Sequence, residues 1–203
     1  MAGPPKSALE PLLGRDGCAR LQRALTARAL RWAGETGTPY LAYADEDTAA
    51  LAGAGTQTFA QVDGHLGERL RAAFAHVSEE HDGPVVVVGT DQPGLSVSHA
   101  WGAADDLRAG VDVTLGPATS GGYYLLGARR FYGELFDIDA EEWGGPRVMA
   151  LTLRSLHEAG LSMGWLRSER DLLAPGDAAA LLADPCAPAD IREILGASAA
   201  GRT

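Results

Sequence analysis

The sequence predicts an α/β fold with a mainly parallel sheet, and three observations support this prediction. Short apolar runs alternate with stretches of helical spacing along most of the chain. The run Val85–Val88 holds four valines in succession, as expected of a strand that is covered on both faces in a parallel sheet. Of the 203 residues, 46% are hydrophobic and 22% are charged, so the chain can build one packed core, and we expect a single domain over residues 1–203.

The first half of the chain contains two predicted helices and three predicted strands. In residues 17–33 the hydrophobic positions from Cys18 to Trp32 recur at helical spacing, so this segment should form an amphipathic helix. Leu66, Leu70 and Phe74 show the same spacing in a second helix. The strands, which are rich in aromatic or β-branched side chains, are expected at residues 39–44, 56–61 and 84–90.

The second half continues the alternation of strands and helices. A helix capped by Ser96 or Ser98 should end near Leu107, and a later helix should end at Gly160. Three more strands are expected at residues 111–117, 121–128 and 161–166. The remaining helices are expected at residues 147–160, 177–184 and 188–198.

The charge balance and the cysteines restrict the classes of function. The chain has 17 Lys+Arg against 27 Asp+Glu, a formal charge of -10, and a pI near 4.9, which disfavours a nucleic-acid partner. No apolar run reaches the roughly 18 residues of a membrane span, and MAGPPKSALEP lacks the regions of a signal peptide. We therefore expect no membrane association and a cytoplasmic location. Cys18, Cys186 and the scattered histidines show no zinc-binding spacing.

Asp91 follows the valine run directly, in the stretch GTDQPGL. Ligands of open α/β sheets bind beyond the carboxyl ends of the strands, and Gly89 allows the backbone to approach a ligand closely. A carboxylate at this point can coordinate Mg²⁺ or Mn²⁺, which bind oxygen ligands and bridge to diphosphates. The alternative is that Asp91 forms an Asx-type turn or caps the next helix.

The stretch GPATSGGYYLLG is the second candidate for a functional loop. Gly121 and Gly122 lie between two strand-like runs, so they form either a tight hairpin turn or a loop against a substrate. Tyr123 and Tyr124 alternate along a strand, so we expect one ring in the core and the other at a cleft or in solvent. Further along, Trp143 lies in a predicted loop, where its ring either stacks on a ligand or fills the core.

Several motifs in order resemble one known family. They are PPKSALEPLLG, HLGERLRAAF, GTDQPGL, GPATSGGYYLLG, EEWGGPRVMALTL and RSERDLLAPGDAAALL. Together they resemble the GT-A-type glycosyltransferases known as radical SAM/selenodomain-associated transferases or arsenosugar-biosynthesis glycosyltransferases. The resemblance covers nearly the whole chain. It implies a nucleotide-diphospho-sugar transferase fold, with three layers and a mixed sheet.

The resemblance also implies a donor site. Asp91 matches the position that holds a metal ion, Mg²⁺ or Mn²⁺, and Lys6 matches a phosphate-contacting residue. Asp171 matches the first aspartate of the family's final motif, and we expect it to be the second metal ligand in place of Leu173. Gly121 and Gly122, with Tyr123 and Trp143 nearby, match the surroundings of the sugar or acceptor. The implied partners are a nucleotide-sugar and a small-molecule acceptor. For Glu68 and Arg69 we expect a structural role rather than a nucleotide contact, and Asp177 matches the last aspartate of the family's final motif.

The sequence also departs from the family pattern. Ala8 replaces an arginine, Ser120 replaces an aspartate before the glycine pair, and Leu173 replaces the middle aspartate of the last motif. The sequence starts within the phosphate-binding loop, so we expect the usual first strand to be lacking, either because the true start lies upstream or because the sheet has lost an element. A nucleotidyltransferase and a non-catalytic binding protein therefore remain alternatives to the glycosyltransferase.

Overall fold

The computed structural model describes residues 6–200, with side chains to residue 196. Its α-helices are α1 (Glu10–Thr36), α2 (Glu46–Ala49), α3 (Leu66–Glu80), α4 (Val97–Arg108), α5 (Val148–Glu158), α6 (Pro175–Ala183) and α7 (Ala189–Ala200). Its strands are β1 (Tyr40–Tyr43), β2 (Gln57–Ala60), β3 (Val85–Val88), β4 (Val113–Pro117), β5 (Tyr123–Ala128) and β6 (Met163–Trp165). Short 3-10 helices are Ser7–Leu9, Gly133–Phe136 and Ala140–Glu142.

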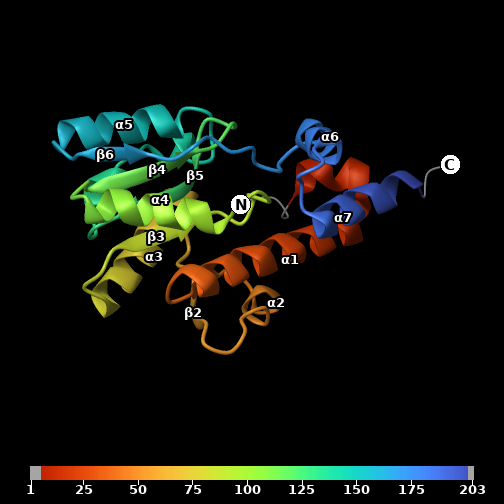
Figure 1. The fold of residues 1–203 in the computed structure, drawn as a ribbon, viewed down its shortest axis with the longest axis horizontal. Helices are drawn as coiled ribbons and strands as arrows, with labels where there is room; N and C mark the ends of the chain where they lie inside the picture. Colours follow the sequence, from red (N-terminus) through yellow and green to blue (C-terminus); the bar gives the residue numbers. More distant parts are fainter. Residues whose placement is uncertain (1–5, 201–203) are drawn as a thin grey trace.

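Within residues 6–200, the strands form two separate sheets. Strands β1 and β2 pair in parallel, and the other four strands form a sheet in the order β3-β5-β4-β6. In this sheet β5 runs antiparallel to both of its neighbours, whereas β4 and β6 are parallel. Since β5 is the one reversed strand, β3, β4 and β6 all point the same way, and their carboxyl ends lie at one edge (Figure 1).

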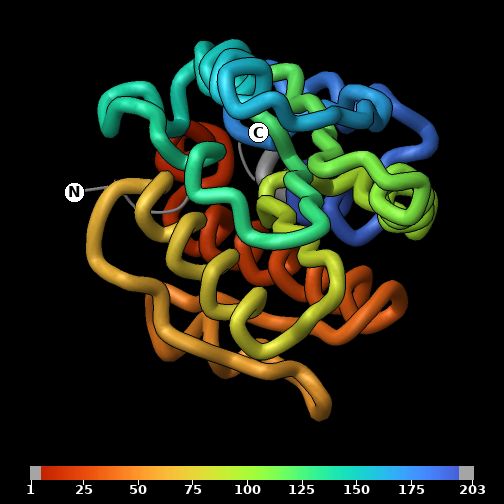
Figure 2. Tube along the Cα trace, turned by 90° about the vertical axis from the view of Figure 1, so that its left-hand side faces the viewer, coloured from red at the N-terminus to blue at the C-terminus, as the bar shows by residue number. Residues whose placement is uncertain are grey.

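Helices cover both faces of the four-stranded sheet. On one face, Phe74 of α3 and Leu156 of α5 pack in a cluster with Leu126 of β5. On the other face, Trp32 of α1 and Ala103 of α4 pack against the same strand. In Figure 2 the orange and gold part of the chain, from the end of α1 through α3, fills the lower half, and the green to blue part fills the upper half. The structure confirms the predicted three-layer α/β fold.

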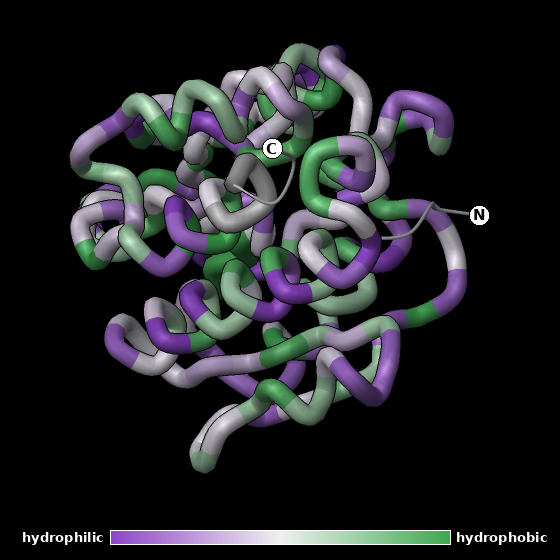
Figure 3. Tube along the Cα trace, turned by 90° about the vertical axis from the view of Figure 1, so that its right-hand side faces the viewer, coloured by the Kyte–Doolittle hydropathy of each residue, from purple (hydrophilic) through white to green (hydrophobic). Residues whose placement is uncertain are grey.

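A further cluster joins the first half of α1 to α6 and α7. Leu21 and Leu25 of α1 are buried against Ile191 and Leu195 of α7. The amphipathic spacing of these helices is visible in Figure 3, where hydrophobic and hydrophilic segments alternate along the helical turns. Gly14 interrupts α1 with a positive φ of 66°, so a one-turn start precedes the long straight part of the helix. Nowhere in the described residues is a helix both long and apolar enough to cross a membrane.

The predicted elements are present, with three differences. The first helix begins at Glu10 and not at residue 17, so part of the expected phosphate-binding loop is helical. The acidic segment after β1 is helix α2, because the Asp45 side chain accepts a hydrogen bond from Thr48 N at 2.7 Å and caps it. The prediction that the valine strand is covered on both sides was wrong in part: only Val85 is fully buried, since the rest of β3 borders a cavity.

Candidate functional site

Two adjoining cavities meet at the carboxyl ends of β1 and β3. The smaller has a volume of about 500 Å³ and is lined in part by Lys6, Asp45, Arg69 and Asp91. The larger, of about 1080 Å³, extends between the two sheets and reaches Asp91 and Asp171 at its polar end. Ligands of open α/β sheets bind at this edge, so the region where the cavities meet is the candidate site.

Lys6 and Asp91 form an ion pair at this site. The Lys6 side chain is 2% exposed, and its Nζ donates hydrogen bonds to Asp91 Oδ1 and to the Leu172 carbonyl, both at 2.6 Å. Lys6 is the only lysine in the sequence, and it has a left-handed backbone with φ 61°. The two residues expected to contact phosphate and metal thus lie together, 85 positions apart in the sequence.

Asp91 keeps part of its carboxylate open to the cavities. Its side chain is 44% exposed, and only Oδ1 is hydrogen-bonded to Lys6. Its main-chain carbonyl accepts a hydrogen bond from Leu172 N at 2.9 Å, which ties the loop after β3 to the segment containing Asp171. The N-cap of α4 is Ser96, so Asp91 does not cap the helix that follows it. Its carboxylate is therefore available to a ligand.

Asp171 is the second acidic group of the site, and it is 8% exposed. Ser120 Oγ donates a hydrogen bond of 2.5 Å to Asp171 Oδ2. Burial raises the pKa of the Asp171 carboxyl, the negative charge of Asp91 raises it further, and the hydrogen bond from Ser120 opposes both. The two carboxyls are therefore electrostatic neighbours, and both line the larger cavity.

A short β-bridge holds Ser120 and Asp171 in register. Ala118 bridges to Glu169 in parallel, and Thr119 N donates to the Glu169 carbonyl at 2.9 Å. The side chain of Glu169 is fixed in turn by His99, which is 2% exposed and whose Nε2 lies 3.0 Å from Glu169 Oε1. This network extends the parallel pairing of β4 and β6 up to the site.

The glycine pair lies in the tight turn between β4 and β5. Ala118 N donates to the Gly122 carbonyl at 3.0 Å, as in a hairpin. Gly121 has φ +97°, and a Cβ there would lie 2.3 Å from the Pro146 carbonyl oxygen. Gly122 has open space at the same position. Gly121 is thus required by the close approach of residue 146, and Gly122 is the one that faces the cavity.

Tyr123 and Trp143 lie at the edge of the core beside the larger cavity. Burial raises the pKa of the Tyr123 hydroxyl well above its usual range. Trp143 Nε1 donates to the Ile138 carbonyl at 3.1 Å, and its ring stacks on Phe136 with 6.4 Å between ring centroids. Both side chains pack against the core, and each also lines the larger cavity with part of its surface.

Two further polar residues, Gln22 and Arg69, lie at the site, and the sequence did not predict either as a binding residue. Gln22 Nε2 donates to Thr90 Oγ1 at 3.1 Å, so α1 supports the loop after β3. Arg69 lines both cavities, donates to Gln61 Oε1 at 3.2 Å, and has a buried Nε with no hydrogen-bond partner in the described structure. The only signal for Arg69 in the sequence is its place in LGERLRAAF, where a structural role was the expectation.

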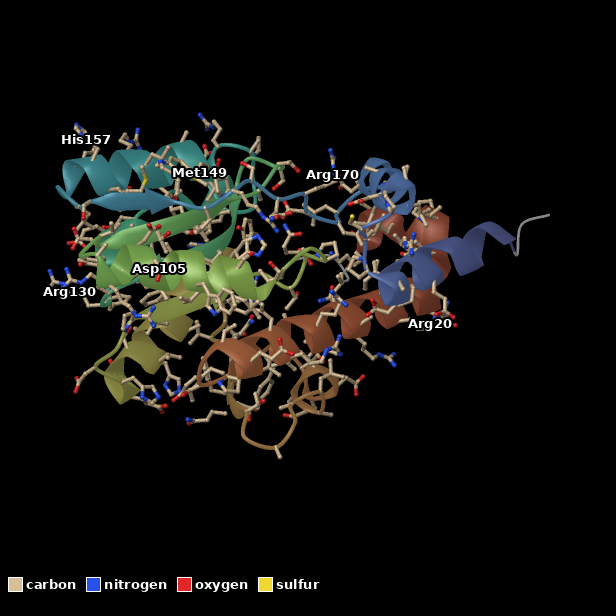
Figure 4. The ribbon with its side chains drawn as sticks, in the orientation of Figure 1. Arg20, Asp105, Arg130, Met149, His157 and Arg170 are labelled. Carbon is tan, nitrogen blue, oxygen red and sulfur yellow. The ribbon has the colours of Figure 1, made fainter. Side chains whose placement is uncertain are left out.

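Two acidic residues of the motifs have structural roles. Asp177 Oδ2 accepts hydrogen bonds from Leu173 N and Ala174 N, at 3.1 and 2.9 Å, and so caps α6. Arg170, which Figure 4 labels on the connection from β6 to α6, pairs with the other oxygen of Asp177 at 3.4 Å. Glu68 Oε2 accepts from His65 N and completes the cap of α3. The predicted structural role of Glu68 is therefore confirmed.

The residues present suit a divalent cation only when a ligand supplies further oxygens. Groups of three or more Asp, Glu, His or Cys side chains suited to a metal ion are absent from the described part of the chain. However, Mg²⁺ is commonly held by one or two carboxylates, water and substrate phosphates. Two carboxylates match that donor set: Asp91, whose side chain is 44% exposed, and Asp171, whose carboxyl is repelled by the negative charge of Asp91.

Comparisons with known proteins place the chain in a family. A family model described as "Uncharacterized protein conserved in bacteria (DUF2064)" matches residues 18–144, which is more than half of the chain. The chain belongs to this family. Among solved structures, the DUF2064 chain is similar to a crystal structure from Desulfovibrio desulfuricans G20, which is described as a "putative nucleotide-diphospho-sugar transferase".

That structural match supports the fold in detail. The two chains share 25% sequence identity and superpose with a TM-score of 0.84 over 98% of this chain and 91% of the other. The DUF2064 protein therefore has the nucleotide-diphospho-sugar transferase fold that the motifs predicted. A search of curated proteins found no match. The narrower likeness to radical SAM/selenodomain-associated or arsenosugar transferases stays a prediction.

Proposed function

We propose that this DUF2064 protein is a glycosyltransferase that moves a sugar from a nucleotide-diphosphate donor to a small acceptor. The observation that carries the proposal is the pair of acidic groups with a buried lysine where two cavities meet at the carboxyl ends of the strands. The match to a nucleotide-diphospho-sugar transferase over 98% of the chain supports the donor class.

The two cavities suit the two parts of such a donor. The smaller cavity, beside α2 and Arg69, has the size for a nucleoside, and the arginine carries a positive charge toward it. The polar end of the larger cavity, at Gly122 and Asp171, would take the sugar and the acceptor. The diphosphate would lie between them, near Lys6 and Asp91.

Mg²⁺ or Mn²⁺ is part of the proposal, with Asp91 and Asp171 as its protein ligands. When bound, such an ion neutralises charge on a leaving diphosphate. Lys6 supplies a second positive charge at the same point, because its Nζ lies 2.6 Å from Asp91 Oδ1. The protein's own contribution to the transfer is thus to hold the diphosphate and to stabilise the charge that develops on it.

The test is ligand binding followed by product analysis. UDP, GDP and their sugars should raise the Tm in the presence of Mn²⁺, by an amount that corresponds to about 2.7 kcal/mol at a hundredfold excess over the Kd. The variant Asp91→Asn should lose the Mn²⁺-dependent part of this shift. Asp105→Asn, an exposed carboxyl on α4 with a side chain 80% exposed, is the matched control and should keep it.

The released product distinguishes the chemistry. A glycosyltransferase releases a nucleoside diphosphate from a nucleotide-sugar. In a nucleotidyltransferase, an acceptor phosphate attacks the α-phosphorus of a nucleoside triphosphate, and pyrophosphate leaves, so the assay includes UTP and GTP. Release of pyrophosphate would replace the proposal with this rival. No metal-dependent binding of any nucleotide would contradict both enzymes.

A binding protein without turnover is a second candidate, and one observation favours it. Lys6 already neutralises Asp91, and Ser120 already satisfies Asp171, so both carboxyls have partners before any ligand arrives. Such a protein would bind nucleotides equally well with and without Mn²⁺ and would release no product from any nucleotide-sugar.

A further inference from the structure

Arg69 lies where the two cavities of the candidate site meet. It lines both of them, as does Asp91 on the loop after β3. The motif LGERLRAAF suggested a structural role for this arginine, and such a role requires that its guanidinium have partners within the protein. The contacts and the charge of Arg69 do not support that role.

The guanidinium of Arg69 has few partners in the described part of the chain, although it carries five N–H donors. Nη1 donates to Gln61 Oε1 at 3.2 Å, and this is its one side-chain hydrogen bond to the residues described. Nε is buried and has no hydrogen-bond partner there. Gln61 is fixed in turn, because its Nε2 donates to the Ala42 carbonyl at 2.9 Å. A neutral amide therefore orients the guanidinium and leaves donors for a further acceptor.

No carboxylate among residues 6–196 neutralises the positive charge of Arg69. The neighbouring cations are paired: Lys6 lies 2.6 Å from Asp91, and Arg71, on the same helix, lies 3.8 Å from Asp137. In addition, Arg69 is in the first turn of α3, where the helix dipole disfavours a positive charge. The fold itself therefore does not compensate a cation at this position.

A phosphate group supplies what this guanidinium lacks. The planar fork of N–H groups fits two oxygens of a phosphate, and such charge-assisted hydrogen bonds are strong. The formal charge of the chain is -10, so an anion needs a local positive charge to approach the site. Lys6 is less available, since both of its hydrogen bonds go to protein oxygens and its side chain is 2% exposed. Among the described residues where the cavities meet, Arg69 is the cation that is free to bind an anionic ligand.

We propose that Arg69 binds the diphosphate of the nucleotide donor and supplies the part of its affinity that needs no metal ion. The inference rests on the proposed function, in which the nucleoside enters the smaller cavity and the sugar enters the larger one. The diphosphate then crosses the junction that Arg69 borders. Lys6 adds its charge from behind Asp91, to which it is bonded, whereas Arg69 contacts the phosphate oxygens directly.

Isothermal titration calorimetry in EDTA, with UDP, GDP and inorganic pyrophosphate, tests the inference. Arg69→Gln keeps an amide but removes the charge, so the Kd for the nucleoside diphosphate and for pyrophosphate should each rise by about tenfold or more. Arg69→Lys keeps the charge without the fork and should recover part of this loss. Arg71→Gln, two positions further along α3 with a side chain 52% exposed, is the matched control and should change neither Kd.

The same titrations with Mn²⁺ separate Arg69 from the metal ligands. In Arg69→Gln, the factor by which Mn²⁺ tightens binding of the nucleoside diphosphate should match that of the unmodified chain, whereas Asp91→Asn should lose this factor. Thermal unfolding without ligand verifies that each variant is folded. Should Arg69→Gln fail to fold, Arg69→Lys carries the same comparison, with a rise in Kd of about threefold or more expected for both ligands.

Three results would overturn the inference. Unchanged affinity of Arg69→Gln in EDTA would return Arg69 to a structural role, and it would leave the proposed function standing because the donor would still bind. Weaker binding of the nucleoside diphosphate with unchanged binding of pyrophosphate would assign Arg69 to the nucleoside instead. If the unmodified chain bound no nucleoside diphosphate, with or without Mn²⁺, the proposed function would fail and the inference with it.

Discussion

Replacement of Lys6 by methionine tests the central pair of the candidate site. Methionine keeps most of the apolar stem but removes the ammonium group, which makes two hydrogen bonds of 2.6 Å. Hydrogen bonds to charged groups contribute about 1.5–3 kcal/mol each. Water can replace the lost hydrogen bond at Asp91, because its side chain is 44% exposed. Leu172 is only 1% exposed, so its carbonyl is left without a donor.

Lys6→Met should lower the free energy of unfolding by about 2 kcal/mol. The loss is smaller than that of two charged hydrogen bonds, because the variant no longer has to remove an ammonium group from water. For a chain of this size that corresponds to a fall in Tm of about 6 °C. Thermal unfolding at pH 7, followed by circular dichroism, measures it. Arg20→Met, on the exposed face of α1 (Figure 4), is the control and should leave the Tm unchanged within about 1 °C.

Lys6→Arg separates charge from geometry. Arginine keeps the positive charge, but its planar fork does not fit a buried position where one nitrogen meets both a carboxylate and a carbonyl. We expect Lys6→Arg to be destabilised at least as much as Lys6→Met. A Tm equal to that of the unmodified chain in both variants would refute the reasoning, since the pair would then contribute nothing to the fold.

Two further predictions follow from the site. The pKa of Asp171 in the folded chain lies above its ordinary value of 3.8, so the unmodified chain loses stability as the pH rises from 3.8 through the folded-state pKa. Asp171→Asn should therefore have a larger free energy of unfolding than the unmodified chain at pH 7, and this difference should shrink as the pH falls below 3.8. The control Asp105→Asn should show no such dependence on pH. Gly121→Ala should lower the free energy of unfolding by about 3 kcal/mol, measured by denaturant unfolding, because of its positive φ and the contact of the new Cβ with the Pro146 carbonyl. Gly122→Ala should lower it by less than about 1 kcal/mol, because the space at its Cβ is open. Equal losses in the two variants would contradict the packing argument.

Local patterns predicted the elements and the position of Asp91, but not the partners. The valine run and the glycine after it are adjacent in sequence, so the strand end and its carboxylate follow from spacing alone. The bonds from Lys6 to Asp91 and from Ser120 to Asp171 join residues 85 and 51 positions apart. Spacing carries no information about such contacts, and here only the order of the family motifs brought these residues into one site.

The spacing of hydrophobic residues also could not predict the strand order or the break in α1 at Gly14. A hairpin turn at the glycine pair, one of the two predicted alternatives, reverses β5 relative to β4, but the similar apolar runs do not reveal that β5 lies between β3 and β4. Gly14 precedes the segment with helical spacing, so that spacing does not reveal that a short helical turn comes before Gly14 or that the chain continues into α1 through a positive φ of 66°. Tertiary contacts decide both features.

Two of the departures from the family motifs, Ser120 and Leu173, change the charge of the site in the same direction. An aspartate at position 120 would place a third negative charge against Asp171, whose pKa is already raised by burial and by Asp91. Ser120 instead donates a hydrogen bond to that carboxyl, and Lys6 neutralises the other. Ser120 and Leu173 thus leave the site with less negative charge than the family motif implies, whereas Ala8 removes a positive charge and Lys6 is shared with the motif. The first two substitutions should make the site depend less on a divalent cation to bring a diphosphate close to Asp91. Weaker metal dependence, rather than loss of ligand binding, is the physical consequence of these substitutions.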